Sequence, residues 1–176
     1  MARRIRPTSP RRQSSTLDLG MAGEYLVCAD LALAGYCAHR TEQHYRYDVI
    51  LDHDGQLWRV QVKSTQAPKE SNHKRTASTT PGKPGRPRKP LSCRYSFHCE
   101  RGLPSHKDKT YKEGDFDICA LVALDTRQVA YMIFDETPRL VHFRAEQFAP
   151  CTSGRAFEDF GIERALKLLN RRKRKR

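Results

Sequence analysis

The sequence predicts an α/β fold in which helices flank a β-sheet, and three observations carry this prediction. Residues 15–34 carry apolar side chains at helical spacing. Residues 47–63 and 117–134 each contain two apolar, β-branched runs joined by a short turn sequence. Residues 155–169 form a second amphipathic stretch, which predicts a helix near the C-terminus. The 176 residues suffice for one domain with a modest core, which we place at residues 15–169.

Basic residues are concentrated in three segments of the chain. The net charge is +13, yet residues 1–12 hold five arginines and no acid, residues 69–94 hold eight basic residues, and residues 171–176 are all basic. The remainder of the chain is net acidic. We expect a basic, disordered arm at residues 1–14 and a basic tail at residues 170–176, a distribution typical of proteins that bind nucleic acid.

The first helix has clear start and stop signals. Ser15 or Thr16 can cap its N-terminus, and Gly35 follows its last turn. Apolar side chains recur at three- and four-residue spacing, so we expect them to form the core face. These residues are Ala22, Tyr25, Leu26, Ala29, Ala32 and Leu33.

Glu24 interrupts a second apolar row of the same helix. A carboxylate in such a row is costly unless it is paired, protonated or bound to a metal. The alternative is an acid at the edge of the stripe that reaches solvent. Gly20 and Gly23 flank Glu24 inside the helix, where glycine is unfavourable, so we expect a close approach to another element there.

Residues 45–63 are the stretch around which the rest of the chain is organised. Apolar runs at residues 47–51 and 57–63 flank an Asp-Gly dipeptide at positions 54 and 55, which is typical of a tight hairpin turn. Side chains alternate between the two faces of a strand. One face of the second strand therefore carries Leu57, Arg59, Gln61 and Lys63, and the other carries Trp58, Val60 and Val62.

The open end of this hairpin brings Asp48 beside Gln61 and Lys63. Such a set suits phosphodiester hydrolysis, because carboxylate, amide and main-chain oxygens can hold a hard divalent cation. The metal would stabilise negative charge on the phosphate and acidify a bound water, and the lysine ammonium would orient that water or neutralise the transition state. The alternative is an ordinary hairpin with a solvated polar face.

Further strands are predicted downstream of the hairpin and one before it. Their residues are 37–40, 93–99, 117–124, 128–134 and 140–143. A basic loop before residue 112 includes Lys107, Lys109 and Tyr111, which we expect to contact phosphates or stack on a base of DNA. A packing role for Tyr111 is the alternative.

Residues 66–92 form a long insertion rich in Pro, Gly, Ser, Thr and Lys, which predicts a flexible loop. Within it, residues 83–90 read Lys-Pro-Gly-Arg-Pro-Arg-Lys-Pro and resemble an AT-hook. An arginine inserted into the narrow, strongly negative minor groove of A·T-rich DNA is the physical basis of that motif. The expected DNA contacts are Lys83, Arg86, Arg88 and Lys89. A solvated low-complexity linker is the alternative.

The order of these features resembles the PD-(D/E)XK nuclease superfamily, and within it the group I intron homing endonuclease-like branch, where Gln-x-Lys replaces the usual acid-x-Lys. The matching residues are Gly23-Glu24, Arg46-Tyr47-Asp48, Arg59-Val60-Gln61-Val62-Lys63, Tyr111, Phe116-Asp117-Ile118 and Pro138. The resemblance covers roughly residues 20–65 and 110–140. It implies a restriction-endonuclease-like α/β core with a mixed central sheet.

The resemblance also implies roles for individual residues. Asp48 would be the main metal ligand, Gln61 would occupy the second ligand position, and the carbonyl of Val62 would assist. Glu24 would lie at or near the metal, and Lys63 would be the catalytic lysine. The implied cofactor is Mg²⁺, for which Mn²⁺ can substitute.

The sequence as a whole therefore predicts a Mg²⁺-dependent endodeoxyribonuclease, homing-endonuclease-like or site-specific. Its expected partner is double-stranded DNA, A·T-rich if the AT-hook resemblance holds, and cutting both strands predicts a homo-oligomer. Two alternatives are a structure-specific nuclease of the junction-resolving kind and a non-catalytic protein that binds A·T-rich DNA through a nuclease-like core.

No run of about 18 apolar residues is present, as a membrane-spanning helix requires. The N-terminus also lacks the apolar segment of a secretory signal. We therefore expect a cytoplasmic, nucleoid-associated protein with no membrane partner. An organelle, reached through an Arg- and Ser-rich transit peptide, or the nucleus is the alternative.

The six cysteines include no Cys-x-x-Cys pair, so free thiols in a reducing compartment are expected. A zinc site is the alternative. Its ligands would be Cys93, His98, Cys99 and His106.

Overall fold

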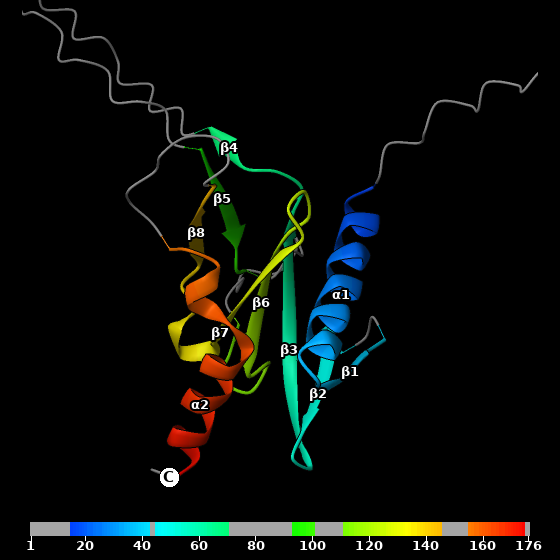
Figure 1. The fold of residues 1–176 in the computed structure, drawn as a ribbon, viewed down its shortest axis with the longest axis vertical. Coiled ribbons are helices and arrows are strands. Elements are labelled where there is room, and N and C mark those ends of the chain that lie inside the picture. The colour runs from blue at the N-terminus through cyan, green and yellow to red at the C-terminus, as the bar shows by residue number, and fades with distance from the viewer. Residues whose placement is uncertain (1–14, 43–44, 71–92, 101–110, 146–154, 175–176) are drawn as a thin grey trace, which may run out of the picture.

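A computed structural model describes residues 15–42, 45–70, 93–100, 111–145 and 155–174 of the chain. These residues form three layers (Figure 1). Two helices cover one face of a five-stranded sheet, and a three-stranded sheet packs against part of the other face. The helices are α1 (Thr16–Leu33) and α2 (Ile162–Lys173).

The five-stranded sheet is mixed, which confirms the predicted fold class. Its strand order is β1-β2-β3-β6-β7, and only the β3–β6 pair is parallel. The strands are β1 (Cys37–Arg40), β2 (Val49–His53), β3 (Gln56–Thr65), β6 (Ile118–Ala123) and β7 (Gln128–Ile133). Residues of α1, α2 and four of these strands share one core, which includes Val27, Leu31, Val60, Ile118, Tyr131 and Leu166.

The predicted hairpin is confirmed in its turn and in its faces. Asp54 and Gly55 both have positive φ, 53° and 71°, as a two-residue turn between twisted strands requires. Trp58 and Val60 are buried in the core, whereas Leu57 faces solvent. Since Val49 pairs with Val60, the residue before β2 is placed opposite the residue after Val60.

The predicted core face of α1 is wrong. Tyr25 is 57% exposed and Leu33 is 90% exposed, and the alanines of that row are exposed as well. The buried residues of α1 are Gly23, Val27 and Leu31, four residues apart. The helix carries apolar residues around most of its circumference, so the pattern alone does not determine which face turns inward.

Gly23 decides the orientation of α1. A Cβ atom at this position would lie 2.8 Å from the Cβ of Ser64 on β3, so only glycine allows this approach. The close approach predicted at Gly23 is therefore confirmed, whereas a Cβ atom at Gly20 would meet nothing within 4 Å. The predicted cap is also confirmed, because the Ser15 hydroxyl accepts from the N–H of Asp18 and the Asp18 carboxylate accepts from the N–H of Ser15.

A second sheet was not predicted. It consists of β4 (Lys69–Glu70), β5 (Cys93–His98) and β8 (Leu140–Arg144), all antiparallel. Alternate residues of β5 and β8 pack against β6 and β7 in a separate core. That core includes Tyr95, Phe97, Cys119, Leu121, Met132, Val141 and Phe143. β5 and β8 were expected as strands, whereas β4 falls within residues 66–92, which were predicted to form a flexible loop. Burial of aromatic side chains on this side of the mixed sheet separates the three strands from it.

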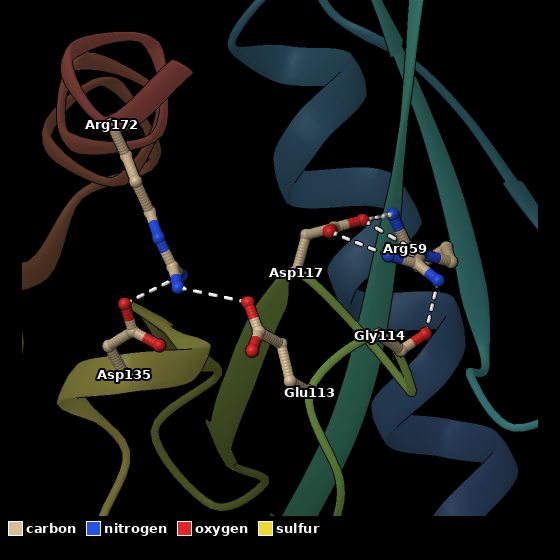
Figure 2. A network of polar contacts seen from close by, with 6 residues as sticks. All are labelled: Arg59, Glu113, Gly114, Asp117, Asp135 and Arg172. Atoms are coloured by element: carbon tan, nitrogen blue, oxygen red, sulfur yellow. Dashed lines mark hydrogen bonds and ion pairs between the residues drawn. The ribbon is translucent and has the colours of Figure 1, made fainter. Parts of the chain in front are cut away.

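The C-terminal helix begins and ends later than predicted. The segment before it forms a short 3₁₀ turn, η2 (Glu158–Phe160), and Gly161 precedes the first residue of α2. The helix continues to Lys173, so most of the expected basic tail is helical. Arg172 forms ion pairs with Glu113 at 3.2 Å and with Asp135 of η1 (Phe134–Glu136) at 2.6 Å (Figure 2).

Neither helix of the described part of the chain has the length and apolarity that crossing a bilayer would require.

Candidate active site

Asp48 lies immediately before β2 and is held against β3. Its N–H donates to the carbonyl of Val60 at 2.9 Å. Its Oδ2 accepts from the N–H of Val62 at 2.7 Å and from the side-chain amide of Gln61. Gln61 is only 7% exposed. The hairpin therefore brings the predicted acid and amide into direct contact.

The environment of Asp48 disfavours the charged carboxylate relative to water. Burial raises the pKa of Asp48 above its ordinary value, and the negative charge of Glu24 raises it further. The N–H of Val62, the charge of Lys63 and the amide of Gln61 lower the pKa without cancelling the increase. A cation next to Asp48 would relieve the repulsion from Glu24 and favour the ionised carboxylate.

Lys63 lies on the same side of β3 as Gln61 and is held by two contacts. Its Nζ donates to the carbonyl of Glu100 at 3.2 Å. The same ammonium lies 5.2 Å from the centre of the Tyr111 ring, within the range of a cation–π contact. Asp48, Gln61 and Lys63 are thus brought together as predicted.

Glu24 is paired with a cation that the sequence did not indicate. Its Oε2 lies 2.8 Å from Nε and 2.6 Å from Nη2 of Arg40 on β1, and the Arg40 guanidinium lies over the Tyr25 ring at 4.3 Å. The carboxylate therefore does not simply reach solvent. Both contacts with Arg40 use the same carboxylate oxygen, Oε2.

An ion pair next to the site fixes β6 to β3. Figure 2 shows the guanidinium of Arg59 directed at the carboxylate of Asp117. Arg59 Nη2 donates to Oδ1 at 2.9 Å, and its Nε and main-chain N–H donate to Oδ2 at 3.0 and 2.9 Å. Arg59 also donates to the carbonyl of Gly114. Asp117, which matched the family pattern, thus positions the strand that runs beside Gln61.

Asp115 is a second anchor, which sequence reasoning missed. It is 4% exposed, and its carboxylate accepts from Arg46 Nη1 at 2.8 Å and from the N–H of Lys112 at 2.9 Å. Arg46 precedes Asp48 by two residues, so this contact links both sides of the site. The spacing Asp-x-Asp at positions 115 and 117 was the available signal, because two acids beside a buried strand need cationic partners.

These anchors hold the segment that carries Tyr111. Its ring packs edge-on against Phe116 at a centroid distance of 5.0 Å and covers Lys63. Tyr111 was expected to contact DNA, with packing as the alternative. The structure shows its ring packed on Lys63 and Phe116, and its contact with DNA stays a prediction.

We expect Tyr111→Leu to increase the acylation rate of Lys63 by roughly 2- to 5-fold, because a cation–π contact of about 0.5–1 kcal/mol is lost. Tyr111→Phe keeps the ring and should leave the rate unchanged. Peptide mass spectrometry after brief treatment with an amine-acylating reagent would measure this, with exposed Lys167 as the internal reference. Equal labelling in the Leu variant and the wild type would contradict the assignment.

The donor set fits a hard divalent cation in part. In the described residues, no group of three or more His, Cys, Asp or Glu side chains is arranged to hold a metal. A cation at Asp48 would therefore also need neutral oxygens. The amide nitrogen of Gln61 contacts Asp48, so its oxygen is the atom that such an ion would use. The oxygen donors of Asp48, Glu24 and Gln61, two carboxylates and an amide, are of the kind that Mg²⁺ and Mn²⁺ prefer.

The zinc alternative gains no support from the described residues, which include Cys93, His98 and Cys99 but not His106. The described cysteines are all free, as expected. The predicted DNA contacts other than Tyr111 lie outside the described residues and stay predictions. They are Lys83, Arg86, Arg88, Lys89, Lys107 and Lys109.

Comparison with solved structures finds a likeness in fold that covers nearly the whole chain. No protein-family model matches the sequence, and no curated protein matches it. A solved structure described as that of a bacterial homing endonuclease, I-Ssp6803I, superposes with a TM-score of 0.60 and 16% sequence identity. The match covers 93% of this chain and 99% of that one. The two chains share a fold. This supports the fold class that the sequence predicted.

Proposed function

We propose that the protein is a metal-dependent DNA endonuclease that hydrolyses phosphodiester bonds, homing-endonuclease-like or site-specific. The observation that carries the proposal is the contact of Gln61 on β3 with Asp48, together with Lys63, whose positive charge acts on Asp48 from the same side of β3. The likeness in fold to a bacterial homing endonuclease supports it.

In this proposal Asp48, Gln61 and the carbonyl of Val62 hold a divalent cation, and Glu24 lies at or near it. The cation, Mg²⁺ or Mn²⁺, supplies positive charge that stabilises the phosphate and acidifies water. Partial burial of Asp48 and Gln61 excludes competing solvent, which strengthens every charge interaction at the site. Lys63 places a positive charge at the phosphate or the attacking water.

The Glu24–Arg40 ion pair bears on this proposal. If Glu24 turns to a cation beside Asp48, the Arg40 guanidinium loses its carboxylate and becomes available to a phosphate oxygen. Metal binding by Glu24 would then free Arg40 to bind a phosphate, so metal binding and DNA binding would strengthen each other. The positive charge of Arg40 also partly offsets the negative charge of Glu24 near Asp48.

The proposed partner is double-stranded DNA, A·T-rich if the AT-hook-like segment engages it. A homo-oligomer is proposed because a single site of this kind cuts one strand at a time.

The test is the nicking and linearisation of supercoiled plasmid in the presence of Mg²⁺, with wild type beside Asp48→Ala and Lys63→Ala. We expect cutting by the wild type only, with DNA binding retained by both variants. Asp52→Ala and Lys167→Ala are matched controls at exposed positions and should cut normally.

Two outcomes would replace the proposal. Cutting of branched but not linear duplexes would identify a structure-specific nuclease. Binding without cutting, with Mg²⁺ and with Mn²⁺ and on both kinds of substrate, would identify a non-catalytic DNA-binding protein.

A further inference from the structure

The three-stranded sheet carries a concentration of basic side chains on the face turned away from the core. Lys69 and His98 are exposed there, and Arg94, His142 and Arg144 are half-buried. Its inward residues, among them Tyr95, Phe97, Val141 and Phe143, are buried. The alternate residues point outward. We call this outward surface the basic sheet face, and its cationic or titratable residues are Lys69, Arg94, His98, His142 and Arg144. Arg155, which is exposed, lies beside β8.

Three of these cations form a row across the sheet. Lys69 of β4 pairs with Arg94 of β5, and Arg94 pairs in turn with Arg144 of β8. Directly opposed like charges destabilise a sheet, and neighbouring strands lie only about 4.8 Å apart. Arg94 and Arg144 also make further contacts within the chain, so it is their charge and placement that matter here.

The centre of the basic sheet face shows the effect of this charge. Ser96 Oγ and His142 Nδ1 lie 3.0 Å apart as a cross-strand pair. The pKa of His142 is lowered by partial burial and then by the positive charges of Arg94, His98 and Arg155, while a hydrogen bond with the main chain of Tyr95 opposes the shift. The surface therefore carries a positive potential that would favour a bound polyanion.

We propose that the basic sheet face binds the phosphate backbone of duplex DNA at a surface separate from the candidate active site. The inference rests on the proposed function in taking DNA as the polyanion. Two observations favour it. The AT-hook-like sequence, residues 83–90, lies between β4 and β5 along the sequence. The chain that leaves β5 also reaches Glu100, whose carbonyl accepts from Lys63, so the sheet and the candidate active site are linked by this contact.

The test measures the salt dependence of DNA binding by the full chain without divalent metal, so that cutting plays no part. Fluorescence anisotropy with a short labelled duplex gives the slope of log K against log salt concentration. Each lost phosphate contact reduces the magnitude of that slope by about 0.9. We expect Arg94→Gln and Arg144→Gln each to reduce the magnitude of the slope by this amount. The double variant should bind the duplex roughly 10- to 100-fold more weakly than the wild type at about 0.1 M salt.

Arg94→Lys and Arg144→Lys keep the charge and should keep the wild-type slope, while Lys167→Gln on α2 removes one exposed charge elsewhere and should change little. Circular dichroism and the unfolding temperature check that each variant is folded. An unchanged slope in the folded double variant would overturn the inference, as would a wild type that does not bind the duplex or a Lys167→Gln variant with an equal effect.

This result is independent of the plasmid assay. A reduced slope together with no cutting would support the basic sheet face and contradict the nuclease proposal. An unchanged slope together with Mg²⁺-dependent cutting would support the nuclease proposal and contradict DNA binding by the basic sheet face.

Discussion

Asp48→Asn is expected to lower the rate of plasmid cutting by at least about 10²–10³-fold, the size of effect seen when one group that stabilises charge in a transition state is lost. The same substitution is expected to stabilise the fold at neutral pH. The amide keeps the shape of the carboxyl and can accept from Val62 N–H, but it carries no charge to bury. If this change in charge at constant shape lowers activity and raises stability, Asp48 serves function although it destabilises the fold.

The pH dependence follows from the raised pKa of Asp48. For an acid whose pKa is higher in the folded state, stability is fully present below the unfolded-state pKa and is lost as the pH rises through the folded-state pKa. The advantage of Asp48→Asn should therefore be absent near pH 3 and complete at pH 7. There we expect the unfolding temperature to rise by about 2–4 °C, which corresponds to about 1 kcal/mol in a chain of this length.

Thermal melts of wild type and Asp48→Asn at several pH values measure this, and Asp52→Asn on the exposed side of β2 is the matched control. A variant that is less stable than wild type at pH 7 would show that the hydrogen bonds of the Asp48 carboxylate outweigh its burial.

Gly23→Ala is expected to destabilise the fold by about 1–3 kcal/mol, because the added Cβ would lie 2.8 Å from the Cβ of Ser64 and α1 would have to move away from β3. Gly20→Ala in the same helix meets nothing within 4 Å and should instead stabilise by about 0.5–1 kcal/mol. Urea unfolding of both variants would measure these opposite signs.

A double-mutant cycle separates the contact from other effects. Ser64→Gly removes the atom that the new methyl group meets, so in the Gly23→Ala background it should cost clearly less than in the wild type. Additive costs of the two substitutions would show that the approach at Gly23 does not set the position of α1. Because α1 also carries Glu24, Gly23→Ala should weaken any activity that depends on Glu24.

Much of the candidate site could be predicted because it lies within one hairpin. The Asp-Gly turn fixes the register, and strand alternation then places Gln61 and Lys63 on one face with Asp48 beside them. These are local rules, and they act over fewer than 20 residues of sequence. The ends of α1 were also predictable, because the Ser15 cap and the glycine at position 35, with φ of 86°, are local signals.

Partners that are distant in sequence could not be predicted. The pairs Glu24–Arg40, Arg46–Asp115 and Arg59–Asp117 join residues 16, 69 and 58 positions apart. No local pattern identifies which of many arginines will meet a given acid. The basic character of residues 170–176 likewise concealed that α2 continues to Lys173, because pairing of Arg172 with Glu113 and Asp135 becomes evident only in the folded chain.

The sequence by itself determined the α/β class, the hairpin and the convergence of Asp48, Gln61 and Lys63, because turn chemistry and alternation act between neighbours along the chain. The tertiary structure decided which face of α1 is buried, that two sheets form, and what surrounds the site. In α1 the apolar residues fit several orientations, and the 2.8 Å approach at Gly23 selects one of them. The second sheet exists because Tyr95, Phe97 and Phe143 are buried against β6 and β7, which depends on the packing of segments far apart in sequence.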